Sequence, residues 1–313
     1  MTDLTQRKRK SRFARAMAPY IRNWDLYLLL IPSIVFFIIF KYIPMYGVQI
    51  AFKNYSARLG IWGSKWVGLK HFDRFFRSYY ATRLITNTLG ISLYSLLVGF
   101  PLPIILAIMM NELQSVRYKK FIQTVTYIPH FLSTVVMVSI INALLSPRAG
   151  LINILIKNMG GTPVYFMSEP SYFQSIYVWS GVWQSMGWNS IIYVAALAGI
   201  DPTLYEAGRV DGASRWQMLL HITIPSIMPT ATIMLILQCG HIMSIGFEKI
   251  FLMQNDLNIA ASDVISTYVY RSGMINAEFS FSAAVDLFNS VVNCILLGLV
   301  NWLSGRMGGS QVF

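Results

Sequence analysis

The sequence predicts an all-α membrane protein with six transmembrane helices, and both its composition and its hydrophobic pattern lead to this fold class. Of its 313 residues, 55% are hydrophobic and only 12% are charged, whereas a soluble domain carries about 25% charged residues. The apolar residues gather in runs of about 20, the length that an α-helix needs to cross a bilayer. Because no long polar stretch separates these runs, we expect one domain embedded in the lipid bilayer.

Six apolar runs are the candidate spans, and four of them contain proline. They cover residues 26–48, 84–110, 121–145, 172–200, 227–247 and 283–303. Pro101 and Pro103 fall in the second run, where the missing N–H and the proline ring predict a bend or break. Pro129 falls in the third run. From the positions of these runs, we divide the chain into a first span with its loop, residues 26–83, and a core, residues 84–305.

The basic N-terminal segment sets the expected orientation. Residues 1–25 hold seven Lys or Arg side chains and lead directly into the first apolar run. Such a segment favours the cytoplasmic side of the membrane, so we interpret it as a cytoplasmic tail and expect no nucleic-acid partner. No small-residue cleavage site follows the run, which argues against a removable signal peptide. Six spans then place both termini, including residues 306–313, in the cytoplasm.

This orientation assigns the connecting segments to opposite sides of the membrane. The cytoplasmic segments are 111–120 and 201–221, and the external ones are 54–83, 146–170 and 248–282. The 54–83 loop carries six Lys or Arg, but inverting the protein would expose the more basic tail instead. An interfacial helix within this loop is predicted from one helical face, made of Leu69, Phe72, Phe75 and Phe76.

The most polar stretch of the second half, residues 201–225, predicts two short helices joined by a turn. Asp201 suits a helix N-cap and Pro202 the first helical position. Gly212 can end this helix and Ser214 can cap the next one. The three-residue spacing of the apolar side chains puts one stripe on the first helix, made of Leu204, Ala207 and Val210.

The same stretch resembles the EAA loop of ABC importer permeases. The family pattern is E-A-A, three residues, G, nine residues, and I-x-L-P, and this chain has Glu206-Ala207-Gly208, Gly212 and Ile222-x-Ile224-Pro225. It departs from the pattern at Gly208, where glycine loosens the helix by roughly 1 kcal/mol, and at Ile224. The resemblance implies that the loop couples the chain to an ATPase through Tyr205, Glu206, Ala207, Gly208, Arg209, Asp211, Gly212, Ala213 and Pro225.

Further stretches are similar to the carbohydrate-uptake branch of these permeases, including those assigned to oligosaccharides and polysaccharides such as alginate. They are KYIPMYGVQIAFKNY (41–55), YIPHFLS (127–133), LAGIDPTLYEAGRVDGASRWQ (197–217) and TYVYRSG (267–273). The resemblance implies a bacterial inner-membrane permease that forms a heterodimer with a second, related permease. It also implies an external solute-binding protein that delivers the carbohydrate, and two ATP-binding subunits that hold ATP and Mg²⁺.

The chain carries no motif for chemistry of its own. It lacks the G-x-x-x-x-G-K-[S/T] phosphate loop, so we expect no ATP, cofactor or catalytic residue in this chain. Its four histidines, at 71, 130, 221 and 241, are not at the spacing of a metal site, so no metal is expected either. Cys239 and Cys294 fall inside predicted spans, where cysteine usually packs as a small apolar side chain.

Polar and aromatic side chains within or near the predicted spans are the candidates for a substrate path. Amides and imidazoles are costly against lipid and should face the bundle interior or a wet cavity, and indole rings can stack on sugar rings. Interhelical hydrogen bonding and core packing are the simpler explanation for each residue taken singly, but we expect some members of the set to line the path. The candidates are Trp183, Gln184, Trp188, Asn189, His241, Ser244, Asn289 and Asn293.

A proton-coupled secondary transporter is the alternative function. Its relay would use His241, Glu248 and Asp286, because ionisable groups within a membrane often mark proton paths. Glu248 and Asp286 fall at the ends of predicted spans, where charges cost little, and no inverted repeat is evident. Transport in the presence of an uncoupler, with ATP maintained, separates the two functions.

Overall fold

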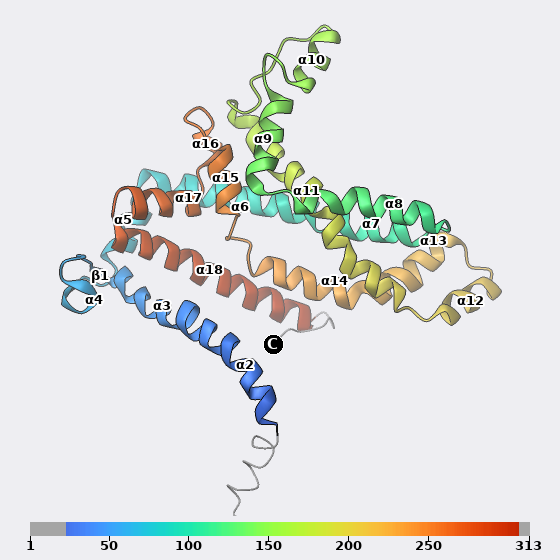
Figure 1. Cartoon of the computed structure of the whole chain (residues 1–313), viewed down its shortest axis with the longest axis horizontal. Coiled ribbons are helices and arrows are strands. Elements are labelled where there is room, and N and C mark those ends of the chain that lie inside the picture. The colour runs from blue at the N-terminus through green and yellow to red at the C-terminus, as the bar shows by residue number, and fades with distance from the viewer. Residues whose placement is uncertain (1–22, 307–313) are drawn as a thin grey trace, which may run out of the picture.

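The computed structural model describes residues 23–306, whose helices form an elongated bundle (Figure 1). The all-α prediction is confirmed, since the strands within this range are one two-residue pair. The predicted cytoplasmic tail, 1–25, and C-terminal end, 306–313, lie almost entirely outside the described residues and stay predictions.

The first long helix stands apart from the bundle. It consists of α2 (Trp24–Phe37), η1 (Ile38–Tyr42), α3 (Ile43–Met45) and η2 (Tyr46–Phe52), which follow one another without a break. None of its most apolar 18 residues is buried within the chain, and its contact with the bundle is made mainly by η2 on α18. A helix that is apolar all round and uncovered by its own chain needs lipid or another subunit around it.

The predicted interfacial helix in 54–83 forms, but its apolar residues do not share a buried face. The segment contains β1 (Lys53–Asn54), α4 (Gly60–Gly63), β2 (Lys65–Trp66), antiparallel to β1, and α5 (Lys70–Phe76). Phe75 is 1% exposed in the core, whereas Leu69 and Phe76 are 67% and 54% exposed. Leu69 precedes α5 as its N-cap residue, Phe75 packs into the core and Phe76 stays uncovered, and the position of this helix at a membrane interface stays a prediction.

The second predicted span is one long helix, whereas the third is two helices. The former consists of α6 (Tyr79–Gly99) and α7 (Pro101–Asn111), interrupted at Phe100. The latter consists of α8 (Val116–Tyr127) with η3 (Ile128–Phe131), and α9 (Thr134–Leu145) at 103° to it. One helix over 121–145 is therefore the wrong description, because α8 gives way to the 3-10 helix η3 next to Pro129, and Ser133 caps the second piece by accepting from the Val136 N–H.

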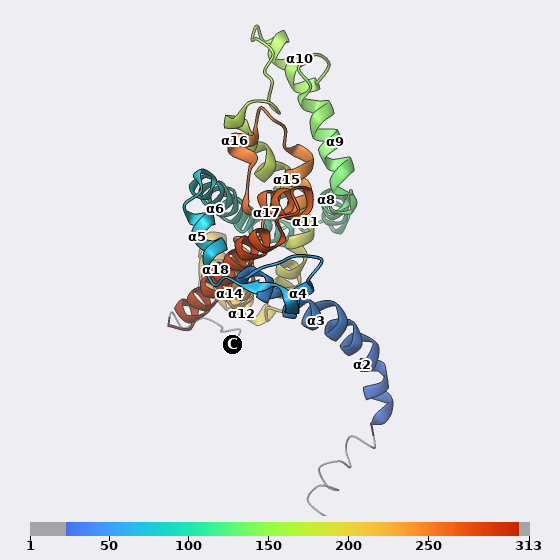
Figure 2. The ribbon, with the colours of Figure 1, turned by 90° about the vertical axis from the view of Figure 1, so that its left-hand side faces the viewer.

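An arm made of α9 and α10 (Leu151–Asn158) projects from the bundle in both views (Figures 1 and 2). Helix α10 lies within 146–170, which was predicted as a loop. The buried Asn153 fastens the arm: its amide donates to the Val164 carbonyl at 2.9 Å and accepts from the Val164 N–H at 2.7 Å. Helix α11 (Pro170–Ala198) follows and contacts α6, α7, α8, α14 and α16, so it lies at the centre of the fold.

The fifth predicted span begins earlier and ends earlier than 227–247. The helix includes α13 (Arg215–Met218), η4 (Leu219–Thr223) and α14 (Ile224–Cys239), and it runs without interruption. Pro225 does not start a new helix because the π-helical turn η4 precedes it, and such a turn accommodates a proline that cannot donate a hydrogen bond. Residues 240–246 form turns rather than a further part of the span.

The segment 248–282, predicted as a polar loop, is instead a packed part of the bundle, and its external side stays a prediction. It holds α15 (Phe247–Met253), α16 (Ile259–Ser262), α17 (Ile265–Tyr270) and η5 (Arg271–Ile275). Ile250, Val264 and Ile265 within it have no exposed surface. Helix α18 (Phe279–Arg306), the sixth predicted span, follows and packs against η2, α5, α14 and α17.

Four of the long helices in the described range are apolar enough to cross a membrane, and the bent α8–α9 pair makes a fifth candidate. The four are Trp24–Phe52, Tyr79–Asn111, Arg215–Cys239 and Phe279–Arg306. Helix α11 is long enough, at 29 residues, but its most apolar stretch is less apolar than theirs. A membrane-embedded chain is therefore supported, whereas the number of six spans stays a prediction.

Candidate functional site: a polar cavity and an exposed helical loop

A cavity of about 390 Å³ lies between α6, α11, the end of α14 and the turn that leads into α15. Four of the eight residues predicted for the substrate path line it, namely Gln184, Asn189, His241 and Ser244. Gln238 and the serines at 92, 95 and 185 add further hydrogen-bonding groups to its wall. The cavity can therefore bind a solute that presents several hydroxyl or carboxylate oxygens.

The other four predicted residues do not line the cavity. Trp183 is 50% exposed on α11, and Trp188 stacks on His130 of η3, with 4.5 Å between ring centroids. Asn289 and Asn293 are buried on one face of α18, as their spacing predicted. Whether a predicted residue faces the cavity depends on the rotation of its helix about its own axis, and the sequence does not define that rotation.

Asn293 does not line the cavity but holds a turn that does. Its side-chain oxygen accepts from the Met243 N–H at 2.9 Å, and its amide donates to the Ser244 hydroxyl at 2.9 Å. It therefore holds the turn that presents Ser244 to the cavity. Asn289 is equally buried, but its side-chain oxygen has no hydrogen-bond partner within the described residues.

Lys249 is a cavity residue that the sequence did not reveal. It lies in α15 with only 9% of its surface exposed, and its ammonium donates to the Tyr177 carbonyl of α11 at 2.9 Å. The same ammonium lies 4.7 Å from the centroid of the Tyr177 ring. A lysine followed by the apolar run IFLM in α15 was the available signal, but the sequence analysis assigns this segment to a loop.

The first of the two short helices predicted at 201–225 is present, whereas the second is the beginning of the long helix Arg215–Cys239, and both predicted caps form. Asp201 accepts from the Thr203 N–H at 2.9 Å and caps α12 (Pro202–Val210). Hydrogen bonds from the backbone and the side chain of Thr203 lower the pKa of the exposed Asp201 carboxyl. Gly212 takes a φ of +77°, which favours glycine, and ends the helix. Ser214 and Gln217 then form a capping box at the start of α13.

Helix α12 turns one side toward its own chain and leaves the rest uncovered. The Tyr205 hydroxyl lies 2.9 Å from that of Thr223, and Gly208 faces Met218 and Ile222. Glu206, Ala207, Arg209, Asp211 and Gly212 are exposed, Ala213 is half-buried, and Pro225 is exposed on α14. The predicted apolar stripe is also uncovered, since Leu204 is 48% and Val210 88% exposed. This helix lies at the end of the bundle opposite β1 and α5 (Figure 1).

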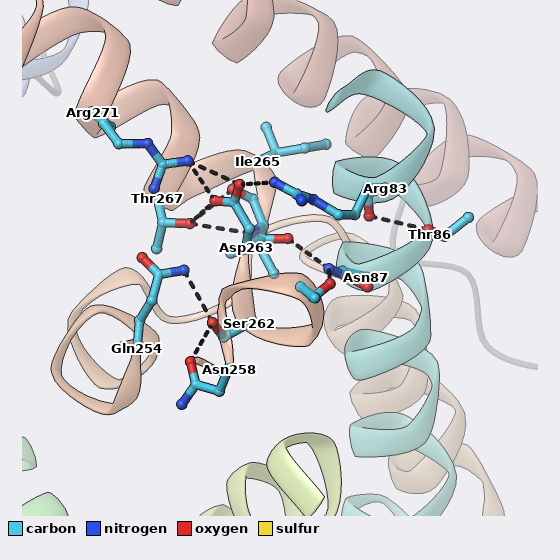
Figure 3. Close-up of polar contacts among 12 residues, drawn as sticks. Arg83, Thr86, Asn87, Gln254, Asn258, Ser262, Asp263, Ile265, Thr267 and Arg271 are labelled. Carbon is cyan, nitrogen blue, oxygen red and sulfur yellow. Dashed lines mark hydrogen bonds and ion pairs between the residues drawn. The ribbon is translucent and has the colours of Figure 1, made fainter. Parts of the chain in front are cut away.

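A buried ion cluster ties α6 to the packed segment 247–275 (Figure 3). Asp263 has no exposed surface and accepts from Arg271 at 2.8 and 2.9 Å and from Arg83 at 3.0 Å. Thr267 donates to the same carboxylate at 3.2 Å, and Asn87 donates to the Asp263 carbonyl at 3.0 Å. The cluster explains why this charged stretch is inside the fold, because paired and hydrogen-bonded charges tolerate burial.

Long apolar helices around a polar cavity are an arrangement that suits a membrane transport protein. The chain belongs to the family described as binding-protein-dependent transport system inner membrane component, whose model matches residues 99–309. The permease resemblance seen in the sequence is thereby confirmed. The family is one of transport permeases, not enzymes, and it gives no support to the proton-coupled alternative.

Two relatives from Bacillus subtilis match almost the whole chain. The polygalacturonan/rhamnogalacturonan transport system permease protein YteP is 40% identical over 305 residues, 97% of this chain and 95% of the relative. Protein LplB is 42% identical over 297 residues, 95% of this chain and 93% of the relative. The match therefore includes the first helix and the loop that precede the region covered by the family model.

Two crystal structures share the fold. A chain of a bacterial ABC transporter that imports the acidic polysaccharide alginate is 42% identical, with a TM-score of 0.86 over 93% of this chain and 99% of that one. A chain of a bacterial alginate ABC transporter in complex with an alginate pentasaccharide-bound periplasmic protein is 41% identical, with a TM-score of 0.88 over 95% and 100%. Both confirm the permease architecture that the sequence predicted.

Proposed function

We propose that this chain is a membrane-spanning subunit of an ATP-driven importer for an oligosaccharide or polysaccharide that an external binding protein delivers. The observation that carries this proposal is the polar cavity in a chain 41% identical, over 95% of its length, to a chain of an alginate importer. Gln184, Asn189, His241 and Ser244 pair with the hydroxyl groups of the sugar as it passes.

Helix α12 is the proposed contact with the ATPase. Its uncovered apolar stripe, with Val210 88% exposed, needs a partner surface, and the family resemblance of this loop supports an ATP-binding subunit as that partner. The capped ends of α12 make it a rigid lever, so closure of the ATPase on ATP and Mg²⁺ is transmitted to η4 and α14. Each chain has one such helix, so two ATPases require a second permease beside this one.

The proposed location follows from the same assembly. The chain lies in the bacterial inner membrane, and α12 and both termini face the cytoplasm, where the ATPases bind ATP. The long first helix, uncovered by its own chain, lies against lipid and the second permease.

Uptake by the reconstituted importer tests the function. The full complex, with its binding protein, is placed in proteoliposomes that contain ATP, and the uptake of labelled oligosaccharides is measured with and without a proton uncoupler. We expect uptake of at least one sugar that needs ATP and the binding protein and that is unaffected by the uncoupler. Uptake that the uncoupler abolishes while ATP is maintained would contradict an ATP-driven importer.

A further inference from the structure

Lys249 brings a positive charge to the cavity, and no acidic side chain of the described chain neutralises it. The residues that line the cavity include serines, amides and a histidine, but no Asp or Glu. None of the ion pairs found within residues 23–306 involves Lys249. Its neighbour Glu248 is exposed and does not line the cavity. The ammonium therefore has a neutral carbonyl and an aromatic ring for partners where a counter-ion is expected.

Helix α11 holds the Lys249 ammonium in place. The Tyr177 carbonyl accepts one of its three N–H groups at 2.9 Å, and the Tyr177 ring lies beneath it. Gly181, one helical turn further along, leaves the space that the ammonium fills, since a side-chain carbon there would lie 3.2 Å from the Lys249 nitrogen. These contacts fix the head group beside the cavity and leave donors free for a ligand.

Burial without a counter-ion makes this arrangement costly in the absence of a ligand. A buried charge is normally paired, and leaving it unpaired is strongly unfavourable. The Asp263 cluster of the same segment shows the usual solution, a carboxylate between two arginines. The Ser92 hydroxyl, on α6 in the same cavity wall, also has no hydrogen-bond partner within the described residues. Both groups are complementary to an anion that carries further oxygens.

We propose that Lys249 binds a carboxylate of the transported sugar and so makes this permease selective for acidic saccharides built from uronic acids. The inference rests on the function proposed above, and it depends on the contacts of this lysine rather than on the substrates of relatives. An ammonium–carboxylate hydrogen bond is stronger than a bond between neutral groups. Lys249 would therefore dominate the discrimination between charged and neutral sugars, while the amides and serines bind the hydroxyls common to both.

The test compares one sugar with and without its charge. The reconstituted importer, with its unchanged binding protein, is supplied with a galacturonic acid trisaccharide, its methyl ester, and a panel of neutral oligosaccharides. Uptake at low sugar concentration is normalised to the amount of assembled complex for wild type, Lys249→Met and Lys249→Arg. Because the binding protein is the same throughout, its own preference cancels in the ratio of variant to wild type. Lys65→Met is the matched control, since Lys65 is exposed in β2 and does not line the cavity.

We expect Lys249→Met to lower the uptake of the acid by about tenfold or more, with uptake of the ester and of any imported neutral sugar changed by less than about twofold. Lys249→Arg should retain most of the uptake of the acid, and Lys65→Met should behave as wild type. Equal losses for acid and ester, or loss of assembled complex in both Lys249 variants, would mean that the lysine serves the fold or pairs with the second permease, and would overturn the inference.

The panel separates this inference from the function on which it rests. A wild-type importer that takes up neutral saccharides and rejects the acid would overturn the role of Lys249 and leave the carbohydrate importer intact. A wild-type importer that takes up no saccharide, charged or neutral, would remove the proposed function and the inference together.

Discussion

Two stretches of this chain, the loop at 201–215 and the segment at 247–275, both carry charged residues between long apolar runs but fold in opposite ways. Glu206 and Arg209 of the loop are exposed, whereas Lys249 and Asp263 of the segment are 9% and 0% exposed. The loop is organised by contacts between near neighbours, such as Ser214 with Gln217. The buried segment depends on partners 180 residues away, as between Asp263 and Arg83. A charged stretch between two membrane helices therefore does not by itself identify a surface loop.

The largest effect is expected from Asp263→Ala in the buried segment. The change leaves Arg83 and Arg271 without their shared carboxylate, and breaking a buried pair costs about 3–5 kcal/mol. The two arginines keep 29% and 32% of their side-chain surface exposed, so we expect a cost of about 3 kcal/mol, at the lower end of this range. A lower unfolding temperature of the purified complex, or less complex in the membrane, is the measurement.

Asp256→Ala is the control for that change, because Asp256 lies in the same segment but is exposed. The two variants should differ clearly in stability. If both behave as wild type, the segment is not held by its buried charges, and the contrast with the exposed loop loses its basis.

In the exposed loop, Val210→Lys should abolish coupling and leave the fold intact. Val210 is 88% exposed at the end of α12, so the chain itself loses no packing, and a cation suits a helix C-terminus. If the apolar stripe docks on the ATPase, the buried ammonium disrupts that contact, and transport and the stimulation of ATP hydrolysis by loaded binding protein both disappear. Val210→Ile keeps the stripe apolar and should transport normally. Normal transport by Val210→Lys would place the ATPase contact elsewhere.

A smaller effect on stability is expected for Asn293 and Asn289, which the sequence analysis placed together as candidates for the substrate path. Asn293→Leu leaves the buried Met243 N–H without its acceptor, which costs about 1–3 kcal/mol, and it frees Ser244 from its position at the cavity. Asn289→Leu removes a side-chain oxygen that has no partner in the described part of the chain, so we expect little loss or a slight gain in stability. The unfolding temperatures of both variants check this order, and the reverse order would contradict the hydrogen-bond assignment.

The smallest perturbation tests the orientation of the two ends of the bundle. In a variant that lacks Cys239 and Cys294, Asp211→Cys should react with an impermeant thiol reagent only from the cytoplasm, and Lys65→Cys only from outside. Both positions are exposed, whereas Ser64 is 5% exposed and hydrogen-bonded to the Gly60 carbonyl, which makes it unsuitable for labelling. Labelling of both cysteines from the same side would refute the predicted topology.

The sequence by itself determined the class of fold, the family and the local structure of the loop at 201–215. Apolar runs define long helices wherever they occur, and the caps at Asp201 and Ser214 and the turn at Gly212 involve residues within three positions of one another. Local chemistry of this kind can be predicted because it does not depend on the rest of the chain.

The tertiary structure alone decided which polar residues meet at the cavity. Gln184 and Asn189 face it while Trp183 and Trp188, on the same helix, do not, and this division depends on how α11 is rotated against α6 and α14. The burial of 247–275 likewise depends on Arg83 and Tyr177, which are distant in sequence. The hydrophobic pattern predicts that a helix forms. The direction in which each side chain points depends on how the helix packs against its neighbours, and those neighbours come from segments far apart in the chain.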